Sequence, residues 1–277
     1  MVTGPGIVSP LAISTGLNFH FLLKVPKYEG KMKEKETMSK IAEPAPWTTE
    51  GEEKRTAVRA MFEEIAPNYD KVNALMSFNR HHQWRQAAVR SLLLRPGARV
   101  LDVCCGTGDF FPPLRAAIGP EGEITGIDFC QPMLDRANAK DANAKLDLGD
   151  ACNLPYPDAQ FDAVTVGWGI RNVPDIDLAH KEAFRVLISG GRFVSVDMAE
   201  PESRLLRAAS RFATSKLLPL LGSLFGNKRA YQYLPESTKR FKTRVELKQS
   251  MEEAGFTDVQ TRDFMFGNVC MHTGRKP

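Results

Sequence analysis

The sequence predicts an α/β fold built around a mostly parallel sheet. Short apolar runs alternate with helical stretches between residues 98 and 196, the first run ends in a glycine turn at Gly106-Thr107-Gly108, and the second ends in a lone acid, Asp128. The runs span residues 98–103, 123–127, 146–148, 161–166 and 192–196. Strands that alternate with helices pair in parallel through right-handed crossovers, so we expect these runs to lie in one sheet.

Helical periodicity precedes the first run and predicts an N-terminal helical cap. From Glu52 onward, apolar residues recur at three-to-four spacing up to Ile65, and Pro67 ends the pattern. A second segment, residues 83–94, ends before a Pro-Gly break. A further helix precedes the fifth run, and its ends are expected at Asp177 and at the glycine pair 190–191.

The end of the chain predicts an antiparallel hairpin at the sheet edge. Residues 256–264 and 269–273 flank Phe266-Gly267-Asn268, and Gly-Asn is typical of a tight hairpin turn. Between the fifth run and this hairpin, residues 203–234 contain six basic side chains and no acid, interleaved with Leu and Phe. Such a stretch predicts a helical insertion that either lies on an anionic membrane surface or packs over the substrate site.

Length and composition favour one large domain. The chain has 277 residues, 43% of them hydrophobic, and we place a single domain at residues 51–277. Residues 1–50 lack steady periodicity and are expected to be a disordered extension or a misassigned start, with Met32 and Met38 as alternative starts.

Charge and cysteine content narrow the class of protein. The formal net charge of +4 gives no reason to expect a nucleic-acid partner. The five cysteines lack metal-like spacing, so we expect buried thiols in a reducing cytoplasm and no metal site. No apolar run approaches the ~20 residues that a bilayer-spanning helix needs.

The glycine turn predicts a nucleoside ligand that lacks phosphate. Phe111 stands where a dinucleotide-binding turn has its third glycine, and no Gly-Lys-Ser/Thr follows. Asp109 would repel a phosphate at the helix N-terminus. The cationic sulfonium and ammonium groups of S-adenosylmethionine would instead be attracted to Asp102 and Asp109. The alternative is an ordinary strand-to-helix turn.

Each expected cofactor contact follows from a strand end. The Asp128 carboxylate is expected to accept hydrogen bonds from both ribose hydroxyls, with a solvated loop acid as the alternative. Asp150 and Ala151 are expected at the adenine edge. The residues of the glycine turn, Gly106, Thr107 and Gly108, are expected to carry the methionine part, because missing side chains permit close approach of the backbone.

Five parallel strands, a terminal hairpin and acids after strands one to three resemble the Rossmann-like, seven-stranded class I methyltransferases that use S-adenosylmethionine. Further motifs resemble the ubiquinone and menaquinone biosynthesis C-methyltransferases, over residues 54–277. They are Tyr69-Asp70-Lys71-Val72-Asn73-Ala74-Leu75-Met76-Ser77 with His81 and Trp84, then Gly169-Ile170-Arg171-Asn172-Val173, Phe184-Arg185-Val186-Leu187 and Gly190-Gly191-Arg192.

This resemblance implies roles for further residues. Arg171 and Asn172 are expected to orient the substrate, with capping or a surface position as the alternative. Tyr69 is expected to close the pocket, and His81 to accept a proton or to make a structural hydrogen bond. Gly167 stands where many family members have a cofactor-contacting Ser, so it offers the cofactor only its backbone.

The implied reaction is C-methylation of a polyprenylated quinol by S-adenosylmethionine, from demethylmenaquinol to menaquinol. The alternatives are the ubiquinone-pathway methylation, methylation of another small molecule such as a phenol oxygen or a sterol, and a non-catalytic subunit of a quinone-synthesis complex. We expect a cytoplasmic protein, peripheral at the inner face of the membrane through residues 203–234. The oligomeric state is left open, with a homodimer as one alternative.

Overall fold

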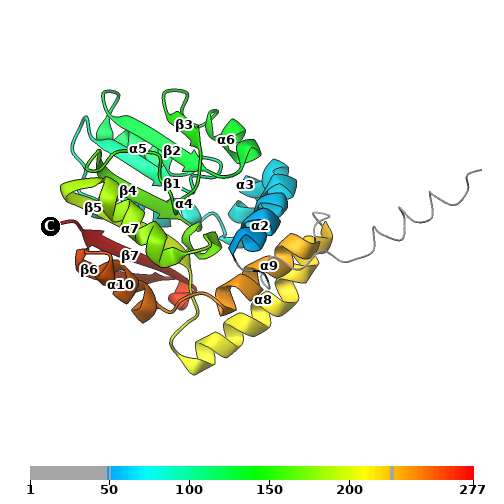
Figure 1. Cartoon of the computed structure of the whole chain (residues 1–277). Coiled ribbons are helices and arrows are strands. Elements are labelled where there is room, and N and C mark those ends of the chain that lie inside the picture. The colour runs from blue at the N-terminus through cyan, green and yellow to red at the C-terminus, as the bar shows by residue number, and fades with distance from the viewer. Residues whose placement is uncertain (1–48, 50, 225–227) are drawn as a thin grey trace, which may run out of the picture. The chain divides into compact units, whose positions relative to one another are not determined.

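The computed structural model describes residues 49, 51–224 and 228–277. Within these ranges it describes every side chain except those of residues 215–224 and 228–232. The extension expected at residues 1–50 therefore lies outside the described residues apart from Thr49, and its boundary stays a prediction. The described chain folds around one sheet with helices on both faces (Figure 1).

Seven strands form the predicted sheet, in the order β3-β2-β1-β4-β5-β7-β6. The strands are β1 Arg99–Val103, β2 Glu123–Asp128, β3 Lys145–Leu148, β4 Phe161–Gly167, β5 Leu187–Met198, β6 Thr257–Phe264 and β7 Val269–Arg275. The first five pair in parallel, and β7 pairs antiparallel with both β5 and β6. The mostly parallel sheet and its antiparallel edge are therefore confirmed.

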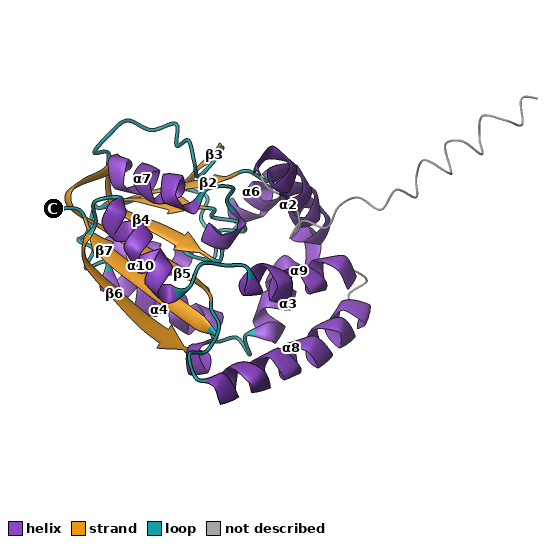
Figure 2. Ribbon diagram, turned by 60° about the horizontal axis from the view of Figure 1, so that its bottom comes forward, coloured by secondary structure: helices purple, strands orange, loops and turns teal. Residues whose placement is uncertain are grey.

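Two buried clusters attach the helices to opposite faces of the sheet (Figure 2). On one face, α4 (His81–Ser91) and α5 (Phe111–Ile118) pack against alternate strand residues such as Val100 and Val194. On the other, α7 (Ile176–Val186) and α10 (Arg244–Glu253) pack against Leu101 and Val164. Because side chains alternate across a strand, neighbouring residues of β1 serve different faces. A shorter helix, α6 (Gln131–Ala137), follows β2.

The N-terminal cap is helical, as predicted, but its segments differ in detail. Helix α2 (Gly51–Ile65) ends before Pro67, and the chain continues through the 3₁₀ turn Ala66–Asn68 into α3 (Tyr69–Met76). The second predicted helix begins two residues early, at His81, and ends at Ser91. Pro67 therefore ends α2, but the helical cap continues beyond it through α3.

Two predicted boundaries are wrong. Helix α7 is capped by Asp175, whose side chain accepts a 3.0 Å hydrogen bond from the Leu178 amide, and β5 begins at Leu187 rather than after the glycine pair. The β6–β7 connection lies between strands that end at Phe264 and begin at Val269, as predicted, and contains the 3₁₀ turn Met265–Gly267, whose three residues all have positive φ.

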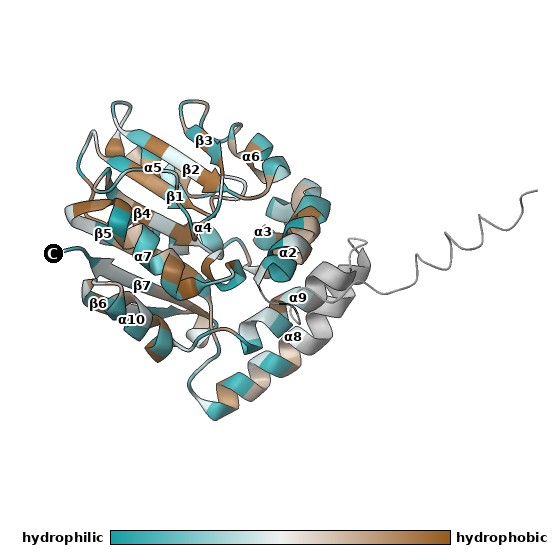
Figure 3. Ribbon diagram, viewed as in Figure 1, coloured by the Kyte–Doolittle hydropathy of each residue, from teal (hydrophilic) through white to brown (hydrophobic). Residues whose placement is uncertain are grey.

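The predicted helical insertion is present as α8 (Arg204–Leu224) and α9 (Lys228–Lys239). Figures 1 and 2 both show α8 at the margin of the molecule, and in Figure 1 α9 lies between it and α2. Hydrophilic and hydrophobic residues alternate along the first half of α8 (Figure 3). Leu205 and Phe212 there are 79% and 66% exposed.

Candidate functional site

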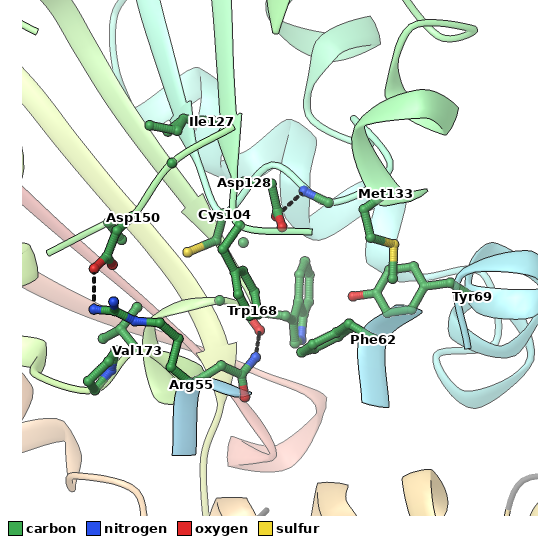
Figure 4. Close-up of a pocket in the computed structure, with 18 residues that line it drawn as sticks. Arg55, Phe62, Tyr69, Cys104, Ile127, Asp128, Met133, Asp150, Trp168 and Val173 are labelled. Carbon is green, nitrogen blue, oxygen red and sulfur yellow. Dashed lines mark hydrogen bonds and ion pairs between the residues drawn. The ribbon is translucent and has the colours of Figure 1, made fainter. Parts of the chain in front are cut away.

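A pocket opens at the carboxyl ends of the parallel strands, near the reversal of strand order between β1 and β4. Its empty volume, including the part open to solvent, is about 680 Å³. Residues that follow β1, β2, β3 and β4 line it, together with side chains from α2 and α3 (Figure 4). This position at the switch point is typical of ligand sites in open α/β folds.

The glycine turn leaves room beside its first glycine. Gly106 has φ +54°, and a Cβ added there would meet nothing within 4 Å. Gly108 has φ +76°, but a Cβ there would come within 2.8 Å of the Phe111 ring. Both need the left-handed backbone that favours glycine. Gly106 thus borders space for a ligand, whereas Gly108 permits the close packing of the loop on α5.

Asp128 ends β2 with both carboxylate oxygens engaged by the backbone. Oδ2 accepts a 2.8 Å hydrogen bond from the Gly106 amide, and Oδ1 accepts a 3.0 Å bond from the Cys130 amide. Each carboxylate oxygen has a second acceptor site, so the group retains capacity for two hydroxyls. Burial raises the pKa of Asp128 to about 6, and the backbone hydrogen bonds act in the opposite direction.

Asp102 lies behind the pocket lining rather than in it. Its Oδ1 accepts a 2.6 Å hydrogen bond from the Thr165 hydroxyl, whereas Oδ2 is buried without a hydrogen-bond partner among the described residues. Burial raises the pKa of Asp102 to about 7. A buried oxygen without a donor is costly unless a ligand or water satisfies it.

Asp109 is neutralised by the protein's own cations. Lys140 bonds to it, Arg85 Nη2 lies 3.0 Å from its Oδ2, and His81 Nδ1 lies 3.7 Å away. Arg85 and Lys140 hold the pKa of Asp109 below its usual value, although burial acts against them. Since its charge is already balanced, Asp109 is poorly suited to attract a cationic ligand, which differs from the sequence-based expectation.

The same cluster explains part of the motif at residues 69–77. Asp70 accepts a 2.6 Å hydrogen bond from the Thr107 hydroxyl and lies 3.0 Å from Lys140. It therefore ties α3 to the glycine turn. His81 is buried in this cluster, with Nδ1 2.6 Å from Arg85, and burial together with the Arg85 charge lowers its pKa to about 4.

Asp150 connects the end of β3 to α2. Its Oδ2 lies 2.5 Å from Arg55 Nη2, an ion pair drawn in Figure 4. Its Oδ1 accepts a 3.0 Å hydrogen bond from the Cys152 amide. Lys54, one residue earlier, donates to the Val173 carbonyl at 2.9 Å. Helix α2 thus contacts two sides of the pocket, through Asp150 after β3 and through Val173 after β4.

The turn after β4 centres on Trp168. This residue has φ +56°, and its carbonyl accepts hydrogen bonds from Arg171 Nη1 at 2.9 Å and from Asn172 Nδ2 at 3.1 Å. The Arg171 guanidinium is buried in an ion pair with Asp197. The Asn172 Oδ1 accepts a 2.7 Å hydrogen bond from the Tyr233 hydroxyl of α9.

The structure brings seven of the twelve predicted site residues to the pocket surface. These are Tyr69, Gly106, Asp128, Asp150, Ala151, Gly167 and Asn172. The other five do not line it: Asp102 lies within β1, and Thr107, Gly108, His81 and Arg171 belong to the turns or the charged cluster beside it. The roles assigned to these twelve residues stay predictions.

Sequence reasoning missed Arg55, Phe62, Trp168 and Tyr233. Phe62 was visible only as an apolar position of α2, yet it lines the pocket and contacts the Tyr69 ring at 6.1 Å between centroids. Nothing in the spacing distinguishes the Arg55 ion pair from an exposed helix charge. Trp168 directly precedes the Gly169–Val173 motif, and this position was the available signal.

The described residues contain neither a metal-binding cluster nor a membrane-spanning helix. Among them, no group of three or more His, Cys, Asp or Glu side chains could hold a metal ion. No described helix combines the length and apolar character needed to cross a membrane.

Comparison with known proteins places the chain in a family. The model of the ubiE/COQ5 methyltransferase family matches residues 48–276. The demethylmenaquinone methyltransferases of Staphylococcus aureus strains JH9 and Newman are each 42% identical over 223 residues, which cover 79% of this chain and 92% of theirs.

Solved structures bear on the fold alone. A SAM-dependent methyltransferase from Thermotoga maritima has a TM-score of 0.58 at 24% identity, covering 79% of this chain and 99% of that one. Another from Aquifex aeolicus has a TM-score of 0.52 at 18% identity, covering 74% and 96%. They confirm the predicted Rossmann-like sheet. With the family model matching most of the chain, the protein belongs to the ubiE/COQ5 methyltransferase family.

Proposed function

We propose that this methyltransferase transfers a methyl group from S-adenosylmethionine to a ring carbon of demethylmenaquinol. The observation that carries the proposal is that one pocket combines Gly106 and Asp128, which suit a nucleoside, with Tyr69 and Asn172 from the two quinone-enzyme motifs. The names of the 42% identical relatives support demethylmenaquinol over other quinols.

The pocket residues fit S-adenosylmethionine. The open space beside Gly106 suits the methionine part, and the free acceptor capacity of Asp128 suits the ribose hydroxyls. Asp150 and Ala151 line the side where the adenine would lie. When bound, S-adenosylmethionine supplies an electrophilic methyl group on a positively charged sulfur.

The chain's own residues would bind and orient the quinol. Its hydroxyl must lose a proton so that electron density reaches the ring carbon. That carbon then forms the new C–CH₃ bond while the S–CH₃ bond breaks and its electron pair stays on sulfur. The ring carbon finally releases its proton, which restores the aromatic ring. In-line transfer needs an approach of roughly 3–3.5 Å, which positioning by the pocket walls would provide.

We infer that a water molecule held in the pocket beside Asn172, which has no basic atom of its own, would accept the hydroxyl proton. His81 was the other candidate, but it does not line the pocket, and its pKa is lowered to about 4 by burial. A general base works best when its pKa is near the operating pH and it is within hydrogen-bonding reach of the proton. Arg171, held by Asp197, would act by fixing the turn that carries Asn172.

A membrane contact through α8 belongs to the same proposal. Arg204, Leu205 and Phe212 are all exposed on this helix, so it presents basic and apolar side chains together. Each basic group contributes about 1 kcal/mol to binding at an anionic membrane surface. Part of this charge is already paired, because Arg211 bonds to Glu200 through two contacts of 2.8 Å. The contact would bring the polyprenyl tail of the substrate close to the pocket.

The membrane contact is tested by vesicle sedimentation. Changing Arg204, Arg207 and Arg211 to Gln should reduce binding to anionic vesicles and leave binding to neutral vesicles unchanged. Unchanged binding to anionic vesicles would favour the interpretation in which α8 and α9 only cover the pocket. The same change at three exposed basic residues elsewhere, Arg90, Arg95 and Lys248, serves as the control.

The reaction itself is tested by mass spectrometry of quinones in a host that lacks its own enzyme. We expect the chain to convert accumulated demethylmenaquinone to menaquinone. Methylation of only the ubiquinone precursor would favour that alternative. Binding of S-adenosylmethionine in vitro without methylation of any quinone would favour a non-catalytic subunit.

A further inference from the structure

Tyr233 contacts a pocket-lining residue, Asn172, from outside the sheet. It lies on α9, 61 residues after Asn172, and only 4% of its surface is exposed. Its hydroxyl lies 2.7 Å from Asn172 Oδ1. The buried contact joins the α8–α9 insertion to the turn after β4, which carries both residues expected to orient the substrate.

The direction of the hydrogen bonds at Asn172 is fixed by its neighbours. A backbone carbonyl can only accept, so the atom 3.1 Å from the Trp168 oxygen must be the amide nitrogen, Nδ2. Oδ1 therefore faces Tyr233, whose hydroxyl must donate to it. Burial raises the pKa of Tyr233 to about 12, so this hydroxyl keeps its proton near neutral pH. Both ends of the amide are thus held.

This arrangement leaves one amide hydrogen for a ligand. Nδ2 carries two hydrogens, and the Trp168 carbonyl takes one of them. Asn172 lines the pocket, so the second can serve a molecule bound there. If the amide rotated by half a turn, Oδ1 would face the Trp168 carbonyl, and two acceptors would oppose each other.

We propose that Tyr233 is a positioning residue, which holds the Asn172 amide so that its second N–H donates to the ionised ring oxygen of the quinol. The inference rests on the proposed function. A donor that is fixed before the reaction stabilises developing negative charge without having to reorient, and such donors contribute strongly to catalysis. The α8–α9 insertion would then be part of the catalytic apparatus.

The test replaces Tyr233 by Phe and compares steady-state kinetics with the wild type. Losing one neutral hydrogen bond should lower kcat about tenfold, with the Kd for S-adenosylmethionine within about twofold. Tyr156→Phe is the matched control, because its buried hydroxyl donates to Asp147 at 2.9 Å and does not line the pocket. The control should leave kcat unchanged.

A double-mutant cycle separates positioning from a structural effect. In an Asn172→Ala background, Tyr233→Phe should change kcat less than about twofold, because the residue it positions is gone. An unchanged kcat in Tyr233→Phe, or the same tenfold loss in both backgrounds, would overturn the inference. A wild type that binds S-adenosylmethionine but methylates no quinol would instead refute the proposed function.

A second variant preserves the shape of the side chain. Substitution of Tyr233 by difluorotyrosine lowers the pH at which the hydroxyl ionises, and an ionised oxygen cannot donate to Oδ1. The fall of kcat on the alkaline side should therefore begin at lower pH than in the wild type. An unchanged pH profile in a folded variant would also overturn the inference.

Discussion

Replacing Asp128 by Asn tests how β2 holds the nucleoside. The wild-type carboxylate accepts from the Gly106 amide at 2.8 Å and from the Cys130 amide at 3.0 Å. An Asn side chain has one oxygen, so its NH₂ group must face one of these two donors. Leaving that buried N–H unpaired should lower the free energy of unfolding by about 1–3 kcal/mol.

The binding cost is separate from this stability cost. Exchanging charged for neutral hydrogen bonds to the ribose should cost roughly 1.5–3 kcal/mol. That corresponds to a roughly ten- to hundredfold rise in the Kd for S-adenosylmethionine. Isothermal titration calorimetry measures the Kd, and urea unfolding measures the stability.

Asp162→Asn is the matched control for this variant. Asp162 also accepts a hydrogen bond from a backbone amide, that of Arg99 at 2.8 Å. It lies near the start of β4, at the amino ends of the parallel strands and so away from the pocket. We expect it to leave the Kd unchanged. A cooperatively folded Asp128→Asn variant whose Kd stays within about twofold of the wild type would refute the reasoning.

Three further predictions concern pH and backbone conformation. Burial raises the pKa of Asp128 to about 6, so the affinity for S-adenosylmethionine should fall as the pH drops through that value. Calorimetry between about pH 5 and pH 8 should show a step in affinity that the Asp128→Asn variant lacks. Identical profiles for the two proteins would contradict the assignment. Gly106→Ala should abolish cofactor binding and lower the free energy of unfolding by about 1–2 kcal/mol. Gly108→Ala should lower it further, because its Cβ would come within 2.8 Å of the Phe111 ring. Equal cofactor binding by Gly106→Ala and the wild type in calorimetry would refute this. Burial lowers the pKa of His180 to about 4, so only the unfolded chain takes up a proton at this side chain as the pH falls below about 6.5. His180→Gln should therefore lose roughly 2–3 kcal/mol less stability than the wild type between about pH 6.5 and pH 4, as measured by urea unfolding. Equal losses in the two proteins would contradict this prediction.

The sheet could be predicted because its signals are local. Each parallel strand is a short apolar run bounded by turn residues, and the first five were located to within a few residues, apart from the start of β5. That start was missed because the glycine pair 190–191 signals a helix end, whereas these residues pair with Lys276 at the end of β7. Such a partner 85 residues away leaves no local trace.

The site was predicted where it depends on strand ends and missed where it depends on packing. Asp128 follows from its place after β2, which topology alone brings to the pocket. Arg55 lines the pocket and Tyr233 holds the pocket residue Asn172, both from helices outside the sheet, and no periodicity reveals where such helices dock. The balance of charge at Asp109 likewise required knowledge of the positions of Lys140 and Arg85.

The most direct test of the central claim is methyl transfer in vitro. Purified protein is mixed with S-adenosylmethionine that carries a labelled methyl group and with chemically reduced demethylmenaquinol, and the product is analysed by mass spectrometry. The account predicts labelled menaquinol, with the label on the ring carbon and none on oxygen, and little or no product from Asp128→Ala. Absence of labelled menaquinol with folded, cofactor-binding protein, or undiminished product from Asp128→Ala, would contradict it.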